Sequence, residues 1–222
     1  SESSPCERLG LGRAAVRFAL AKLAQEGLVQ SVPKRGYIVS PVTLKDVEDI
    51  YTMRLLLEPG AAALAARRIT PDEVRAITAI DSGDLPRGPD YLEQSLQQNM
   101  RFHLAVANAS GNPRIATAVA RLLEEVERML HLWIGSGESI ASEVGQQDAD
   151  HERVVKCLAS RDAVGAEAAL RDHLVAAHHS ILNAVVKRPS LVDLGARCAG
   201  AEMKGHEWTW ACSLAPGRTR AS

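Results

Sequence analysis

Between residues 44 and 187, apolar residues recur every three or four positions, which is the period of an amphipathic helix. Alanine and leucine are abundant and β-branched runs are few, so helices are favoured over strands. Pro59-Gly60 marks a point where a helix could kink, and Thr70-Pro71 has the residues of a helix start. We expect helices over residues 44–69, 70–80, 90–109, 113–134, 147–159 and 162–187.

The length and composition are consistent with one or two domains that have a real core. The chain has 222 residues, 46% of them hydrophobic and 4% aromatic. No stretch approaches the roughly 18–20 consecutive apolar residues of a membrane span. The four cysteines form no C-x-x-C pair, so a disulfide framework is not indicated and a reducing, cytoplasmic setting fits best. The sequence predicts a mainly α protein, with an antiparallel all-α helical bundle over residues 42–188.

Residues 1–41 have a different pattern from the rest of the chain. Two short helical segments are separated by Leu9-Gly10-Leu11-Gly12, and Gly27 ends the second one. Strand-forming residues follow on both sides of a Pro33–Gly36 turn. The order of helix, tight turn, helix and basic hairpin predicts a winged helix-turn-helix domain, incomplete at its start.

Charge supports an anionic partner for this first module. Residues 1–41 carry six Lys and Arg against three Glu, a balance of +3, whereas the remainder carries 20 basic and 24 acidic residues. Arg13 and Arg17 are four positions apart at the start of the second helix, where base edges are contacted in helix-turn-helix proteins. Lys34 and Arg35 stand at the hairpin tip. The alternative is that each is a solvated surface charge.

The helix expected at 90–109 has polar residues on its apolar side. Leu92, Leu96, Asn99, His103, Val106 and Ser110 step by four and three positions and so form one stripe. A buried polar group without a hydrogen bond costs about 1–3 kcal/mol. Two such groups on adjacent turns therefore need a shared explanation.

Two further histidines lie on apolar stripes of later helices. His151 shares a face with Val154, Val155 and Leu158, and His173 shares one with Leu170, Leu174 and Ala177. Three imidazoles and one amide aimed inward suit a divalent metal such as Zn or Ni in a bundle core. The alternative is that each is a core histidine hydrogen-bonded to a carbonyl group. Spacing alone does not bring the three histidines together.

The first module resembles GntR-type bacterial transcription regulators. The stretch "LGLGRAAVRFALAKLAQEGLVQSVPKRGYIV" is similar to their recognition helix and wing. The resemblance implies a double-stranded DNA operator as partner, contacted by Arg13, Arg17, Arg35 and Gly36. The family's first helix has no counterpart here, so we expect the N-terminus to be truncated.

The second module resembles the effector domain of the FadR branch, called the FCD domain. The similar stretches are "EDIYTMRLLLEPGAAALAARR", "NMRFHLAVANASGNPRI" and "DHERVVKCLASRDAVGAEAALRDHL", and they span about residues 44–185. The resemblance implies a divalent metal site at Asn99, His103, His151 and His173. Aspartate is the commoner residue at the first position, and the amide of Asn99 is a weaker ligand.

A metal held by three imidazoles and an amide leaves positions open for a ligand. We expect a small carboxylate effector, anchored a second time by the guanidinium fork of Arg54 and less favourably by Arg128. A salt bridge between Arg54 and Glu58 is the alternative for the first of these. The resulting hypothesis is a ligand-responsive, homodimeric DNA-binding transcription regulator rather than an enzyme.

A metal-dependent hydrolase or lyase is the alternative function, because three histidines and an open position are also a catalytic zinc arrangement. The sequence has no H-E-x-x-H motif, and Glu152 beside His151 would point elsewhere on a helix. A helix-turn-helix also has no use in such an enzyme. From residue 189 to residue 222 no helical or strand period is evident, so we expect an irregular or disordered tail.

Overall fold

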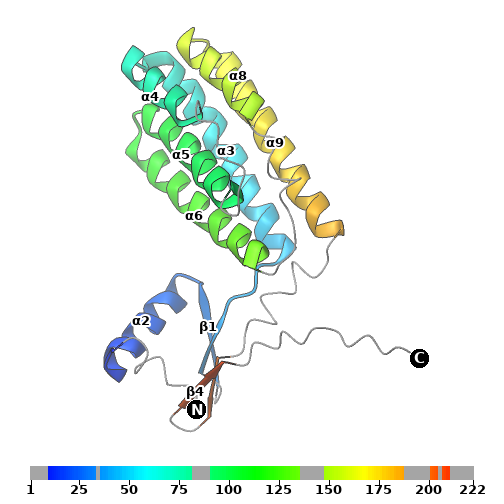
Figure 1. Cartoon of the computed structure of the whole chain (residues 1–222). Helices are drawn as coiled ribbons and strands as arrows, with labels where there is room; N and C mark the ends of the chain where they lie inside the picture. Colours follow the sequence, from blue (N-terminus) through cyan, green and yellow to red (C-terminus); the bar gives the residue numbers. More distant parts are fainter. Residues whose placement is uncertain are drawn as a thin grey trace, which may run out of the picture. The chain divides into compact units, whose positions relative to one another are not determined.

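The structure is a computed structural model of the chain (Figure 1), and it describes residues 10–33, 36–81, 91–135, 148–187, 201–204 and 207–210. Two compact units divide the chain. One comprises residues 1–43 together with residues 192–222, and the other comprises residues 44–191.

Helix α2 (Arg13–Gln25) of the first unit ends in a glycine cap, as the sequence predicted. Gly27 has a φ of +75°, a left-handed conformation that suits glycine. Its N–H donates to the Ala24 carbonyl at 3.1 Å, and the Leu28 N–H donates to the Leu23 carbonyl at 2.9 Å. This pair of bonds is a Schellman motif, and it turns the chain into the first strand.

A two-stranded hairpin follows α2 and confirms the predicted wing. Strands β1 (Val29–Val32) and β2 (Gly36–Val39) pair antiparallel, with Val29 opposite Val39 and Val32 opposite Gly36. Gly36 has a φ of +94°, which explains why glycine stands directly after the turn. Lys34 and Arg35, the predicted basic tip, lie outside the described residues.

The tail differs from the irregular segment that the sequence led us to expect. Strands β3 (Ala201–Lys204) and β4 (Glu207–Trp210) pair antiparallel, with Met203 opposite Trp208. Each strand has four residues, so its period-two alternation of larger apolar and polar residues is very short. The sequence pattern therefore gives no signal for the pairing of these two strands.

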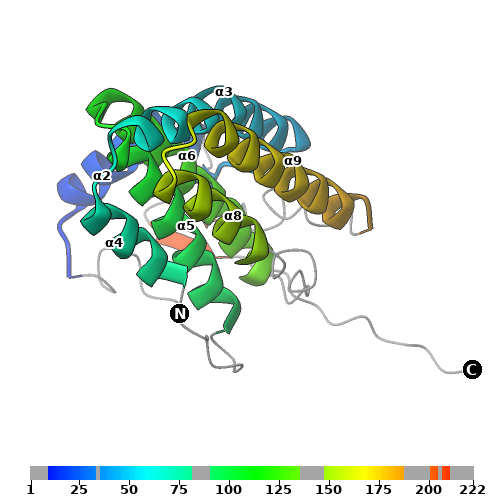
Figure 2. The same ribbon diagram turned by 90° about the horizontal axis from the view of Figure 1, so that it is seen from above.

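The second unit is a helical bundle, as predicted (Figures 1 and 2). Helix α3 packs against α5, α6, α8 and α9, and α4 packs against α5 and α8. Its helices are α3 (Leu44–Arg68), α4 (Pro71–Asp81), α5 (Tyr91–Ala109), α6 (Pro113–Gly135), α8 (Asp148–Ala159) and α9 (Ala163–Lys187).

Local capping signals set several of these helix boundaries. Thr70 and Glu73 form a capping box at the start of α4, in which Glu73 Oε2 accepts from the Thr70 N–H at 2.8 Å. Asn112 caps α6, and its Oδ1 accepts from the Arg114 N–H at 3.1 Å. Pro59 lies inside α3, which continues on both sides of it. Boundaries set by such neighbouring residues can be predicted from sequence.

Small side chains on α3 form the centre of the core. Ala62, Ala65 and Ala66 are fully buried and pack in one cluster with Phe102 of α5 and Leu170 of α9. Because alanine has only a methyl group, α3 can approach its neighbours closely. This close packing brings side chains of α3, α5, α8 and α9 into contact in the same part of the bundle.

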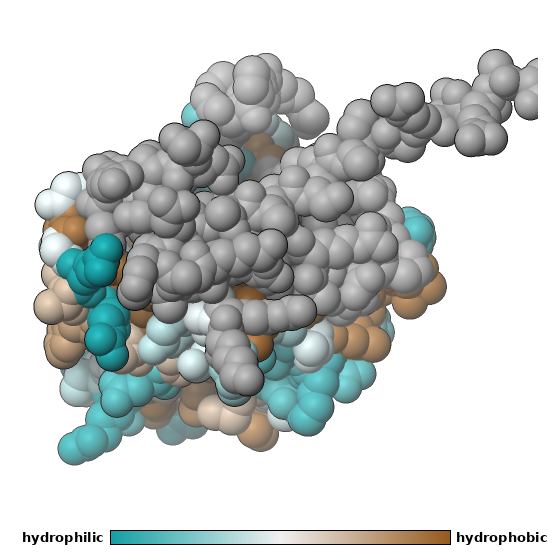
Figure 3. Space-filling view, turned by 90° about the horizontal axis from the view of Figure 1, so that it is seen from below, coloured by the Kyte–Doolittle hydropathy of each residue, from teal (hydrophilic) through white to brown (hydrophobic). Residues whose placement is uncertain are grey.

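The described residues on one face of the molecule have a mixed character. Hydrophilic and hydrophobic residues are interspersed on the face drawn in Figure 3. Among the described helices, none combines the length and the apolar character that crossing a membrane would require.

Candidate metal and effector site

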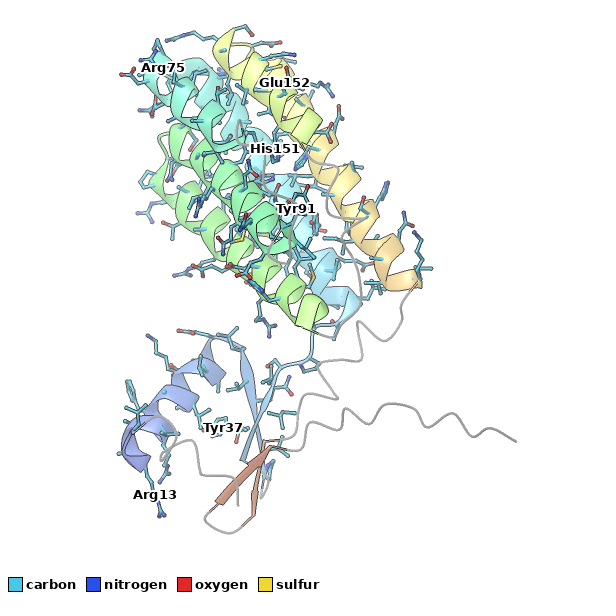
Figure 4. The ribbon with its side chains drawn as sticks, in the orientation of Figure 1. Arg13, Tyr37, Arg75, Tyr91, His151 and Glu152 are labelled. Atoms are coloured by element: carbon cyan, nitrogen blue, oxygen red, sulfur yellow. The ribbon has the colours of Figure 1, made fainter. Side chains whose placement is uncertain are left out.

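Three buried histidines from three helices meet inside the second unit. His103 of α5, His151 of α8 and His173 of α9 are 1%, 1% and 2% exposed. Each offers one ligand atom, and these atoms all lie within 4.8 Å of one another. Figure 4 marks His151 among the helices, whereas the next residue, Glu152, is exposed. The structure thus joins the three histidines that the sequence placed on apolar stripes.

The imidazole rings are held close together by packing. The Nε2 atoms of His103 and His173 are 3.2 Å apart. The ring of His151 stacks on that of Phe102, with centroids 3.8 Å apart and planes inclined by 12°. Its centroid lies 4.6 Å from that of His173. The cluster is therefore compact and has an aromatic wall on one side.

A carboxylate from α3 binds the opposite nitrogen of His103. Glu58, which is 1% exposed, has its Oε2 2.5 Å from His103 Nδ1. Its Oε1 accepts from Arg54 Nε at 2.6 Å. Arg54 is 2% exposed, and its Cζ lies 5.1 Å from the ring centroid of Tyr51. Buried charges require partners of this kind, because an isolated one would cost several kcal/mol.

Burial and charge set the protonation of this cluster. Burial lowers the pKa of His103 to about 4, although the Glu58 carboxylate opposes the shift. Burial, and then the nearby imidazoles, lower the pKa of His173 to about 2. Burial alone would raise the pKa of Glu58, but the charges of Arg54 and His103 outweigh it and hold that pKa at about 2. Near neutral pH, His103 and His173 are neutral and Glu58 is ionised.

The buried polar atoms that lack a hydrogen-bond partner within the described part of the chain include Oδ1 of Asn99 and Nη2 of Arg54. Asn99 precedes His103 by four residues, so both lie on one face of α5, one turn apart. An unpaired buried acceptor and an unpaired buried donor each cost free energy of folding. A bound metal ion or ligand would give each of these atoms the partner that no described side chain provides.

The two arginines predicted to bind an effector differ in position. Arg54 is buried beside the cluster and makes the salt bridge with Glu58 that the sequence offered as the alternative. Arg128 lies half-buried on α6, a helix that contributes none of the three histidines. The structure therefore connects Arg54 to His103 through the carboxylate of Glu58.

The site contains Glu58, which the sequence indicates only as a salt-bridge partner of Arg54. Its contact with His103 joins residues 45 positions apart. No local spacing signals such a pair. The only hint in the sequence is that Glu58 follows Arg54 by four residues, so that both lie on the same face of the helix.

The donor set fits a divalent metal. Neutral imidazole is a good ligand for Zn, Ni, Cu and Fe. Two nitrogens that bind the same zinc ion at about 2.1 Å lie roughly 3–4 Å from each other. The distance of 3.2 Å between His103 Nε2 and His173 Nε2 agrees with this. The unpartnered Oδ1 of Asn99 supplies an oxygen on the same helix face as His103.

The basic residues of α2 are placed as the sequence predicted. Arg13 and Arg17 are both exposed in the first two turns of the helix, and Val16 between them is buried at 9% exposure. Arg13 is labelled at the start of α2 in Figure 4. Burial of Val16 fixes the helix on its own unit while both guanidinium groups remain available to solvent.

Comparison with known families identifies the second unit. The FCD domain model matches residues 49–176, which is more than half of the chain. The chain belongs to the FCD family. This match covers the three histidines, Asn99, Arg54 and Glu58.

Relatives of this FCD protein are transcription regulators. An HTH-type transcriptional regulator of Streptomyces ambofaciens is 29% identical over 86% of this chain and 79% of its own length. The HTH-type transcriptional regulator LutR of Bacillus subtilis is 27% identical over 76% of this chain and 84% of its own. The Glc operon transcriptional activator of Escherichia coli is 26% identical over 78% of this chain and 76% of its own length.

Solved structures show the same fold. Escherichia coli McbR/YncC has a TM-score of 0.62 at 20% identity, covering 82% of this chain and 84% of that one. A GntR family regulator from Pseudomonas syringae has a TM-score of 0.55 at 24% identity, covering 83% and 76%. These structures show the fold. The FCD match, together with relatives named as HTH-type transcriptional regulators, confirms the resemblance to GntR-type transcription regulators of the FadR branch. The relatives give no support to the hydrolase or lyase alternative.

Proposed function

We propose that this FCD regulator binds a divalent metal, such as Zn²⁺ or Ni²⁺, through His103, His151 and His173. The amide oxygen of Asn99 would be a fourth ligand. Bound there, the metal would act as a Lewis acid that attracts an anionic oxygen of a ligand. The observation that carries the proposal is the 3.2 Å approach of two buried Nε2 atoms from different helices, both on neutral imidazoles.

The regulator would recognise a small carboxylate as its effector. Arg54 holds one buried guanidinium nitrogen, Nη2, without a partner among the described residues, while its Nε is occupied by Glu58. A carboxylate oxygen is the natural acceptor for that nitrogen. Arg128 of α6, which the sequence also predicts to bind the effector, remains the second candidate anchor.

Arg13 and Arg17 would contact operator DNA as the start of a recognition helix. Lys34, Arg35 and Gly36 would contact it as the wing. A homodimer would place two such modules on a roughly palindromic operator. If the effector binds more tightly to one arrangement of the dimer, DNA and effector affinities become reciprocally coupled.

A metal analysis of the purified full chain tests the proposal. Wild type, His103→Ala and His173→Ala would be saturated with Zn²⁺, freed of excess by gel filtration and analysed by mass spectrometry. His179→Ala is the matched control, since His179 is exposed on the same helix as His173. We expect metal in wild type and control and strongly reduced metal in the other two. Equal metal in all four would refute the assignment.

A further inference from the structure

Glu58 contacts His103 as well as Arg54, and this second contact gives it a specific role in the site. Its two carboxylate oxygens are divided between two groups, Oε1 facing Arg54 Nε at 2.6 Å and Oε2 facing His103 Nδ1 at 2.5 Å. The residue is 1% exposed. Arg54 therefore neutralises and orients the carboxylate, and the carboxylate in turn contacts the imidazole.

This contact determines which nitrogen of His103 carries the proton. An ionised carboxylate only accepts hydrogen bonds, so a neutral imidazole must donate to it through Nδ1–H. Nε2 then keeps its lone pair, and Nε2 is the atom that faces His173 Nε2 at 3.2 Å. The ring is thus held with its basic nitrogen toward the centre of the cluster.

We propose that Glu58 is a positioning residue that fixes the tautomer and orientation of His103 and thereby sets the affinity of the cluster for a divalent metal. The inference rests on the proposed metal site. Groups that orient a metal-binding histidine in this way change metal affinity by about 10- to 100-fold when removed. Helix α3 thereby becomes part of the metal site, although it contributes none of the proposed ligands.

A second carboxylate near the cluster provides a comparison within the same molecule. Asp150 Oδ2 lies 3.6 Å from His173 Nδ1, which is too long for a hydrogen bond, and the Asp150 side chain is 45% exposed. Solvent can replace this contact, whereas the buried contact of Glu58 has no substitute. Glu58 and Asp150 should therefore differ strongly in their effect on metal affinity.

Affinity for Co²⁺ measured on the full chain tests the inference. The variants are Glu58→Gln and, as a matched control, Asp150→Asn. Glutamine retains an oxygen that can accept from Nδ1–H, but it lacks the charge and can present its NH₂ group instead. We expect the dissociation constant to rise about 10- to 100-fold in Glu58→Gln, with an altered visible spectrum of bound Co²⁺. In Asp150→Asn it should change less than threefold. Circular dichroism verifies the fold of both variants.

A measurement on the wild-type chain keeps the inference testable if Glu58→Gln does not fold. Long-range ¹⁵N–¹H NMR of the metal-free protein with labelled histidine reports which nitrogen is protonated. We expect His103 to be neutral with its proton on Nδ1, and a proton on Nε2 would overturn the inference. A wild-type chain that binds no divalent metal would overturn the metal part of the proposed function and this inference with it. Metal binding unchanged by Glu58→Gln would overturn the inference alone.

Discussion

His103 and His173 are 70 positions apart in the sequence, yet their Nε2 atoms lie 3.2 Å apart inside the helical bundle. Both rings are at most 2% exposed. Two lone pairs cannot approach this closely without a proton or a cation between them. In the metal-free protein one of these two nitrogens must therefore carry a proton and donate it to the other. A divalent metal would replace that proton.

Removal of metal should lower the stability of the regulator. A ligand that binds only the folded state stabilises it by about 2.7 kcal/mol at a hundred times its dissociation constant. We expect a chelator to lower the midpoint of thermal unfolding and an excess of Zn²⁺ to restore it. In His103→Ala the same additions should change little. An identical response of wild type and His103→Ala would argue against a site at this histidine.

Loss of Arg54 should destabilise the bundle strongly. Arg54→Met leaves the Glu58 carboxylate buried without its cationic partner, and breaking a buried pair typically costs about 3–5 kcal/mol. Arg171→Met is the control, since Arg171 also pairs with a Glu four residues away, but both side chains are nearly half exposed. The exposed pair should contribute about 0–1 kcal/mol. Urea unfolding measures the loss of free energy of unfolding in each variant. Similar losses in Arg54→Met and Arg171→Met would contradict the prediction.

Acid should destabilise the metal-free protein. Burial lowers the pKa of His103 from 6.5 to about 4 and that of His173 from 6.5 to about 2. Below pH 6.5 the unfolded chain therefore binds more protons than the folded one, and folding stability decreases as the pH falls toward these values. The free energy of unfolding that the two neutral histidines contribute above pH 6.5 is therefore lost as the pH falls below 6.5. Glu58 adds to this loss below its ordinary pKa of 4.5, because its pKa in the folded protein is about 2.

Urea unfolding in the presence of chelator, between about pH 7.5 and about pH 4.5, measures this dependence. A free energy of unfolding that is constant, or that rises on acidification, would contradict the neutral, buried state of the two histidines.

Substitution of the basic residues on α2 should weaken DNA binding. Arg17→Ala removes an exposed guanidinium from the second turn of the helix. If it contacts a phosphate, the slope of log K against log salt should decrease by about 0.9. Lys22→Ala makes the same charge change on a different face, near the helix end. Gel shifts with DNA selected from random sequence by the wild-type chain compare the two. Equal losses would exclude a specific role for Arg17.

Much of the fold follows from local signals in the sequence. The helix boundaries depend on neighbouring residues, such as Thr70 with Glu73 and the glycine at position 27. The four-residue strands β3 and β4 were missed because a period of two cannot be distinguished over so short a segment. Local signals therefore work best where an element is long or begins with a cap.

The site was only partly predictable. Helical period placed His103, His151 and His173 on buried faces, and their burial confirms this part. Their convergence depends on how α5, α8 and α9 pack, which no spacing encodes, and the family resemblance supplied it. Glu58 was missed as a partner of His103 because the contact joins helices α3 and α5 across 45 positions.

Anomalous scattering from crystals of the full chain grown with Zn²⁺ tests the central claim most directly. The account predicts a zinc peak within bonding distance of His103 Nε2 and His173 Nε2, with a nitrogen of His151 completing the three imidazoles. It also predicts Glu58 on the opposite nitrogen of His103. An anomalous map with no peak between these histidines, in crystals that hold zinc elsewhere, would contradict it.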